Sequence, residues 1–136
     1  MNSLSAHSLI VAASIYMLIS LALAWLSTGV RILRVGSLKD RFPAHDNLVK
    51  AHIDYLLMAL LLMAYYLLAD ELAFQYPTWV LLTMIVGAAL NPFMFIVVAM
   101  HKPEEFRPGI MFKAMTMFSF ITTTIGFAAA AIMVAF

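Results

Sequence analysis

The side chains that could do chemistry lie within or at the edges of long apolar stretches. His52 and Asp54 fall where one apolar run begins, and Asn91 precedes Pro92 well inside another. A neutral imidazole can ligate a metal or hydrogen-bond a ligand while its second nitrogen is oriented by a nearby acceptor. Polar groups placed at membrane depth are costly and often mark functional sites. These residues are therefore the first candidates for a binding or catalytic site.

Each of these residues also has a structural interpretation. His52 can be an interfacial histidine that meets headgroups or water. Asp54 can satisfy amide groups at the N-terminus of its helix, where the dipole favours a carboxylate, or it can pair with an arginine of a neighbouring subunit. Asn91 can satisfy backbone groups freed by a kink at Pro92, or present its amide to a ligand at a bend that opens a pocket. The last two interpretations of Asn91 are compatible.

The elements that must position these residues are membrane-spanning helices. Hydrophobic residues make up 65% of the 136 positions and charged residues only 11%, which is too little polar surface for a soluble domain of this size. The apolar residues are concentrated in runs about as long as the ~20 residues that a spanning helix needs. The sequence predicts an all-α four-helix transmembrane bundle that forms one integral membrane domain over residues 1–136, with spans at about 8–30, 51–69, 74–100 and 110–136. The absence of cysteine excludes disulfides and thiolate metal sites.

Lysine and arginine lie in two of the three predicted connections. The basic residues in question are Arg31, Arg34, Lys39, Arg41 and Lys50 in the first, and Lys102, Arg107 and Lys113 in or beside the third. The connection around residues 70–77 has none. The positive-inside rule predicts both termini outside and both basic loops in the cytoplasm. We expect a bacterial inner-membrane protein with the lipid bilayer as a partner, and the net charge of +1 argues against nucleic acid.

Three short motifs resemble the styrene oxide isomerase family, whose small four-span members bind haem b between the subunits of a trimer. The family has Gly-His-Gly at the start of span one, Val-Pro followed by Arg-Ala-His at span two, and Ser-Asn in span three before a proline-containing turn. The corresponding residues here are Ala6-His7-Ser8, Phe42-Pro43 with Lys50-Ala51-His52, and Leu90-Asn91 with His101-Lys102-Pro103. The separations between these motifs agree with the family to within a residue or two, and the resemblance covers most of the chain.

The resemblance implies a site as well as a fold. It places His52 as the axial ligand of the haem b iron, and Asn91 as the catalytic amide. Tyr55, on the same predicted helix face as His52, and the cations Arg34, Arg41 and Lys50 would contact the cofactor, with the cations near the propionates. Ferric haem would act as the Lewis acid that isomerises a small hydrophobic epoxide to an aldehyde. The resemblance also implies a homotrimer, and the small-residue surface around Gly126 is suited to tight helix contact within the chain or between subunits.

Two departures from the family leave other functions open. The family's pocket Asn, six residues after the histidine ligand, is Met58 here, and its pocket Tyr falls on Phe95. An apolar distal side suits a gas ligand, a redox role or an altered substrate. The glutathione-dependent membrane proteins of eicosanoid metabolism are a second, weaker resemblance, since they carry Arg-Ala-His-x-Asn where this chain has Lys50-Ala51-His52-Ile53-Asp54. A non-enzymatic membrane scaffold is the third possibility.

Overall fold

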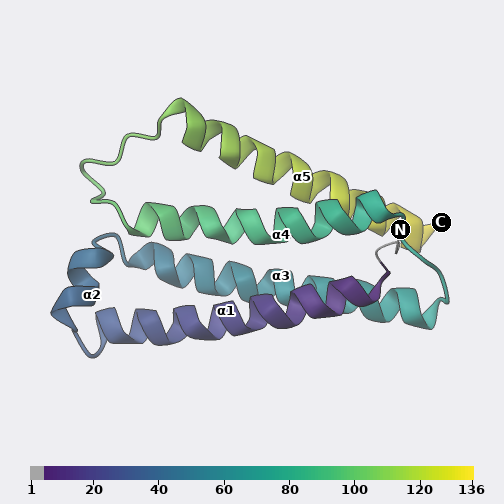
Figure 1. Ribbon diagram of the computed structural model, residues 1–136, viewed down its shortest axis with the longest axis horizontal. Helices are drawn as coiled ribbons and strands as arrows, with labels where there is room; N and C mark the ends of the chain where they lie inside the picture. Colours follow the sequence, from purple (N-terminus) through teal and green to yellow (C-terminus); the bar gives the residue numbers. More distant parts are fainter. Residues whose placement is uncertain (1–4) are drawn as a thin grey trace.

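The computed structural model describes residues 5–136, and this part of the chain is helical without any strand. Its helices are α1 (His7–Arg31), α2 (Gly36–Arg41), α3 (Asp46–Glu71), α4 (Thr78–Ala99) and α5 (Ile110–Ala135), arranged as in Figure 1. Four of them, all except α2, are long and apolar enough to cross a membrane. The prediction of an all-α bundle is confirmed, and so is the prediction of four helices with the length and composition needed to span a membrane.

The observed helix ends differ from the predicted spans for identifiable reasons. The second span was predicted from residue 51, but α3 already begins at Asp46, whose carboxylate in the first turn is favoured by the helix dipole. The third was predicted from residue 74, but α4 begins at Thr78, directly after Pro77. Proline lacks the amide hydrogen that a preceding helical turn would need, so it stands at the entry of the helix. The first basic connection, expected as a loop, contains the short helix α2.

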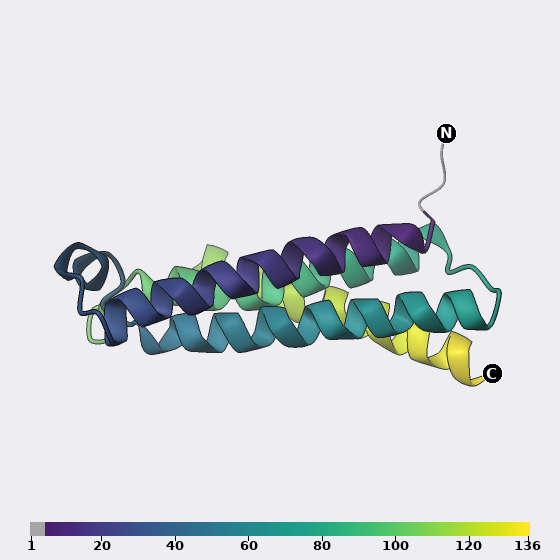
Figure 2. The same cartoon turned by 90° about the horizontal axis from the view of Figure 1, so that it is seen from below.

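The four long helices pack in the order α1, α3, α4, α5. Helix α3 contacts both α1 and α4, whereas α5 contacts α4 alone among the substantial helix pairs of the described chain. Figure 2 shows α1 and α3 side by side, with α4 and α5 behind them. The buried residues between the helices are mostly small or aliphatic, among them Leu9, Ala13, Leu48, Ala59, Leu62 and Val80. Larger apolar side chains face outward on every long helix, as expected for surfaces in contact with lipid.

The antiparallel order places the polar connections at opposite ends of the bundle. The start of α1, the end of α5 and the α3–α4 connection lie at one end, while α2 and the α4–α5 connection lie at the other (Figure 1). The lysines and arginines of both basic connections therefore lie at the same end of the bundle. The positive-inside rule predicts that an end with this excess of lysine and arginine faces the cytoplasm. The cytoplasmic position of that end remains a prediction.

Helices α4 and α5 approach so closely that two glycines are required at their crossing. A Cβ atom added to Gly87 would lie 2.6 Å from the Cα atom of Thr123. One added to Gly126 would lie 2.7 Å from the backbone nitrogen of Met84. The buried residues of α5 begin at Ser119, and towards its N-terminus the helix diverges from α4 (Figure 1). The glycine crossing is therefore what attaches α5 to the rest of the bundle.

The first prediction concerns this crossing. We expect Gly87→Ala to lower the free energy of unfolding by about 1–3 kcal/mol, because the added methyl group meets helix backbone that must move away. Gly36→Ala is the matched control, since a Cβ at Gly36 meets nothing within 4 Å. Thermal unfolding in mild detergent measures both variants. Equal melting temperatures for Gly87→Ala and wild type would show that α5 is not held in this way.

Candidate functional site

His52 is held against α1 by hydrogen bonds to a single serine. Its Nδ1 atom lies 2.8 Å from the backbone oxygen of Ser20 and 2.9 Å from the Ser20 hydroxyl. The same hydroxyl donates to the backbone oxygen of His52 at 2.9 Å. Ser20 is fully buried and His52 is half-buried. We call this arrangement the Ser20–His52 clamp; it fixes the imidazole ring relative to two helices.

The clamp also determines which ring nitrogen carries the proton. A backbone carbonyl oxygen can only accept a hydrogen bond, so the Nδ1 atom of His52 is the donor. In the neutral imidazole the Nε2 atom then has the free lone pair. Within residues 5–136, Nε2 has no hydrogen-bond partner. An imidazole whose Nδ1–H is held by a backbone carbonyl and whose Nε2 is free is the usual form of a histidine metal ligand.

The cations predicted to contact a cofactor lie near the same end of the bundle. Lys50 precedes His52 by two residues on α3, Arg34 follows α1, and Arg41 is the last residue of α2. All three are exposed, and in the described part of the chain none of them forms a salt bridge. Arg34 adopts a φ of 52°, in the left-handed region, at the turn where the chain leaves α1. Their charges are available to an anionic group at this membrane surface.

Tyr55 lies in the helix core. Its exposed fraction is 4%, its ring packs against Tyr16 at a centroid distance of 5.8 Å, and its hydroxyl donates to the backbone oxygen of Ala89 at 3.0 Å. The Tyr16 hydroxyl donates similarly to the backbone oxygen of Ile85 at 2.8 Å. Both acceptors are in α4, within two turns before Pro92. The Tyr55 hydroxyl, which was predicted to face a cofactor, thus joins α3 to α4, and the Tyr16 hydroxyl joins α1 to α4.

Asn91 and Asp54 form a pair that joins α4 to α3. The side-chain nitrogen of Asn91 donates to Oδ2 of Asp54 at 2.7 Å. Asp54 lies eight residues after Asp46, the first residue of α3, and Asn91 lies eight residues before Ala99, the last residue of α4. Because the two helices are antiparallel, these positions are at the same depth. The predicted spans, 51–69 and 74–100, did not place the two residues at matching depths, so the sequence carried no signal for the pair, and we had considered Asp54 and Asn91 only as separate residues.

The structure does not bring His52 and Asn91 together within one chain. His52 bonds to α1, whereas Asp54 and Asn91 line a groove between α3, α4 and α5 that includes neither His52 nor Tyr55. Phe95, the position of the family's pocket tyrosine, lies in this groove. Met58 is partly buried against the helix core. The predicted site residues therefore separate into two faces, with the histidine on one and the amide on the other.

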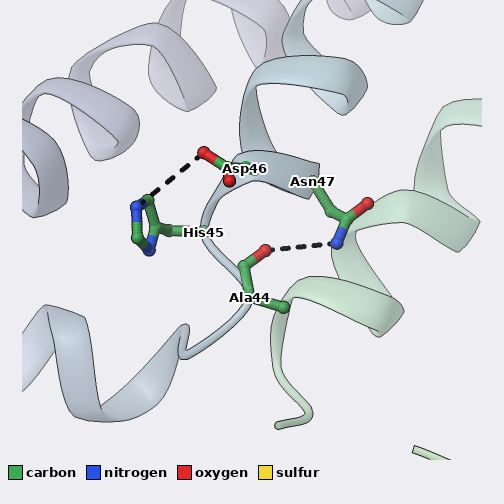
Figure 3. A network of polar contacts seen from close by, with 4 residues as sticks. All are labelled: Ala44, His45, Asp46 and Asn47. Atoms are coloured by element: carbon green, nitrogen blue, oxygen red, sulfur yellow. Dashed lines mark hydrogen bonds and ion pairs between the residues drawn. The ribbon is translucent and has the colours of Figure 1, made fainter. Parts of the chain in front are cut away.

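A tight turn sets the start of α3, the helix that carries both faces. The Asn47 side chain donates to the backbone oxygen of Ala44 at 3.3 Å, and Nε2 of His45 lies 3.8 Å from the Asp46 carboxylate (Figure 3). The backbone nitrogen of Ala44 donates in turn to the oxygen of Ala99 at 3.2 Å, at the end of α4. The register between α3 and α4, on which the Asp54–Asn91 pair depends, is thus fixed at the basic end as well.

Comparison of the chain with protein-family models, with curated proteins and with solved structures finds no match. The resemblance to the styrene oxide isomerase family therefore rests on the sequence motifs alone.

The second prediction concerns the Asp54–Asn91 pair. We expect Asn91→Leu to lower the free energy of unfolding by about 1–3 kcal/mol, because it leaves the Asp54 carboxylate without its donor at membrane depth. The double variant Asp54→Leu with Asn91→Leu should recover part of that loss, since neither polar group then remains unpaired. Thermal unfolding of wild type, both single variants and the double variant completes the cycle. Additive effects of the two substitutions would contradict a direct coupling.

Proposed function

We propose that the protein binds haem b through the Nε2 atom of His52. The observation that carries this proposal is the Ser20–His52 clamp, which orients the ring, puts the proton on Nδ1 and leaves the Nε2 lone pair free. Histidine is an axial ligand of haem iron in several classes of haem protein. A hydrogen bond on the other ring nitrogen of such a histidine raises the basicity of the ligating nitrogen. The Ser20 backbone oxygen supplies that bond here.

The remaining chemistry of the chain fits the same cofactor. Haem has an apolar macrocycle and two anionic propionates. The outward surfaces of the spanning helices are apolar, and Arg34, Arg41 and Lys50 are exposed without salt bridges in the described residues. We infer that these cations hold the propionates at the basic end of the bundle. Tyr55 contributes by keeping α3 attached to α4, because its hydroxyl is committed to Ala89.

We further propose that the protein forms a homotrimer. A molecule that contacts both His52 and Asn91 has to lie between two copies of the chain, because within one chain these residues lie on different faces. Contact between two different faces of identical subunits is head-to-tail, and such contacts form a closed ring when the rotation between successive subunits closes. The number three comes from the resemblance to the trimeric family.

The proposed activity is isomerisation of a small hydrophobic epoxide, with bound ferric haem supplying Lewis-acid chemistry. Asn91 would orient the substrate oxygen. Its side-chain nitrogen carries two hydrogens, and the bond to Asp54 uses only one of them. Because Met58 and Phe95 stand where the family has polar groups, we expect weaker turnover than in the family, and a gas-binding or redox role for the haem if turnover is absent.

The third prediction tests the haem ligand. Purified protein produced with sufficient haem should show a Soret band, and His52→Ala should lose it while retaining its helix content. His101→Ala is the matched control, because the Nδ1 atom of His101 also bonds to a backbone oxygen, that of Val97 at 2.8 Å, but the residue lies in the exposed connection after α4. It should keep the band. A colourless wild-type protein would refute haem binding, and a band that survives in His52→Ala would refute this ligand.

A further inference from the structure

The groove beside the Asp54–Asn91 pair contains two groups that the haem proposal does not use, the carboxylate of Asp54 and the ring of Phe120. It has a volume of about 340 Å³ and lies between α3, α4 and α5. Lys50, Asp54 and Asn91 provide its polar groups, and Leu57, Phe95 and Phe120 line its apolar walls. We call it the Asp54 groove. This volume is near the lower end of the range of about 300–1,000 Å³ that is typical of small-molecule sites.

The Asp54 carboxylate has an oxygen that the protein leaves open. Oδ2 accepts the hydrogen bond from Asn91, but Oδ1 has no hydrogen-bond partner among residues 5–136. Asp54 forms no salt bridge in that range either, although Lys50 lies one turn earlier on the same helix. A carboxylate within a span is costly without a counter-ion. The groove is therefore complementary in charge to a cation.

The residues that line the groove indicate which kind of cation would bind there. Two aromatic rings, Phe95 on α4 and Phe120 on α5, line it together with the aliphatic side chain of Leu57. Aromatic faces attract weakly hydrated ammonium groups, and combined with a carboxylate they favour organic ammonium ions over strongly hydrated metal cations. An apolar body on the ligand would replace lipid contacts along the same walls.

We propose that the Asp54 groove binds a small hydrophobic ammonium ion. Its positive group contacts the free Oδ1 atom of Asp54, and its apolar part packs against Leu57, Phe95 and Phe120. Asn91 acts as a positioning residue, because its hydrogen bond to Oδ2 fixes the orientation of the carboxylate. The groove shares Lys50 and Asn91 with the proposed haem function, but it does not contain His52, and neither Asp54 nor Phe120 has a role in holding the haem.

The test compares two probes of equal shape, phenyltrimethylammonium and its neutral carbon analogue tert-butylbenzene. The binding of each to the full-length protein in lipid nanodiscs is measured by equilibrium dialysis, with empty nanodiscs giving the contribution of the lipid. The ammonium charge is permanent, so the comparison is independent of pH. Wild-type protein should bind the ammonium probe at least about tenfold more tightly than the neutral analogue, as expected for a desolvated charge pair with aromatic walls.

Two pairs of variants locate the site. Asp54→Asn should weaken ammonium binding about tenfold and leave tert-butylbenzene binding unchanged. Asp46→Asn, at an exposed acid on the same helix, should change neither. Phe120→Leu should weaken ammonium binding about threefold through loss of the aromatic face, whereas Phe118→Leu should not. Phe118 and Phe120 are the same residue type on one helix and are equally exposed at 56%, but only Phe120 lines the groove.

Several outcomes would overturn the proposal. These are equal affinity of wild-type protein for the two probes, equal affinity of wild type and Asp54→Asn for the ammonium probe, or equal effects of the two phenylalanine substitutions. If Asp54→Asn does not fold, the comparison of Phe120→Leu with Phe118→Leu decides. The Soret band of Asp54→Asn, measured on the same samples, reports separately on the haem proposal and should not change.

Discussion

The bilayer has no water to satisfy polar groups at membrane depth, and the polar contacts of this bundle follow from that constraint. Ser20 and His52 bond to each other across α1 and α3. The hydroxyl groups of Tyr16 and Tyr55 reach backbone oxygens of α4, and Asn91 reaches Asp54. In a core made mostly of alanine and aliphatic residues, these directional bonds set the register of α1, α3 and α4. Helix α5, attached through the glycine crossing, relies on close packing instead.

The same bonds leave specific atoms unused, and these atoms define what the protein can bind. The imidazole of His52 uses Nδ1 for the clamp and keeps Nε2 free. The Asp54 carboxylate uses Oδ2 for Asn91 and keeps Oδ1 free. One face therefore offers the Nε2 atom of His52, and the other offers the Oδ1 atom of Asp54 beside the rings of Phe95 and Phe120. Two such different faces on one small bundle favour separate ligands, or an assembly in which the face of one copy meets a different face of the next.

The sequence predicted the long helices well, because an uncharged apolar run of about 20 residues has the length and composition of a membrane-spanning helix. It also identified His52, Asp54 and Asn91 as unusual, since each is a polar residue in an apolar setting. It did not reveal their partners, because pairing depends on the register of antiparallel helices. Ser20 had no signal of its own, as a single serine within a span is ordinary. Tyr55 was assigned to the cofactor from its shared face with His52, but α4 occupies that position and takes its hydroxyl.

The protonation of the His52 ring tests this account most directly. Solid-state NMR of protein labelled with ¹⁵N-histidine in lipid bilayers reports which ring nitrogen carries the proton, and how each responds to haem. We predict that the His52 resonances, assigned by their loss in His52→Ala, show a protonated Nδ1 and an unprotonated Nε2, and that added haem changes the Nε2 signal while Nδ1 stays protonated. A protonated Nε2 in the haem-free protein, or an Nε2 signal indifferent to haem, would contradict the account.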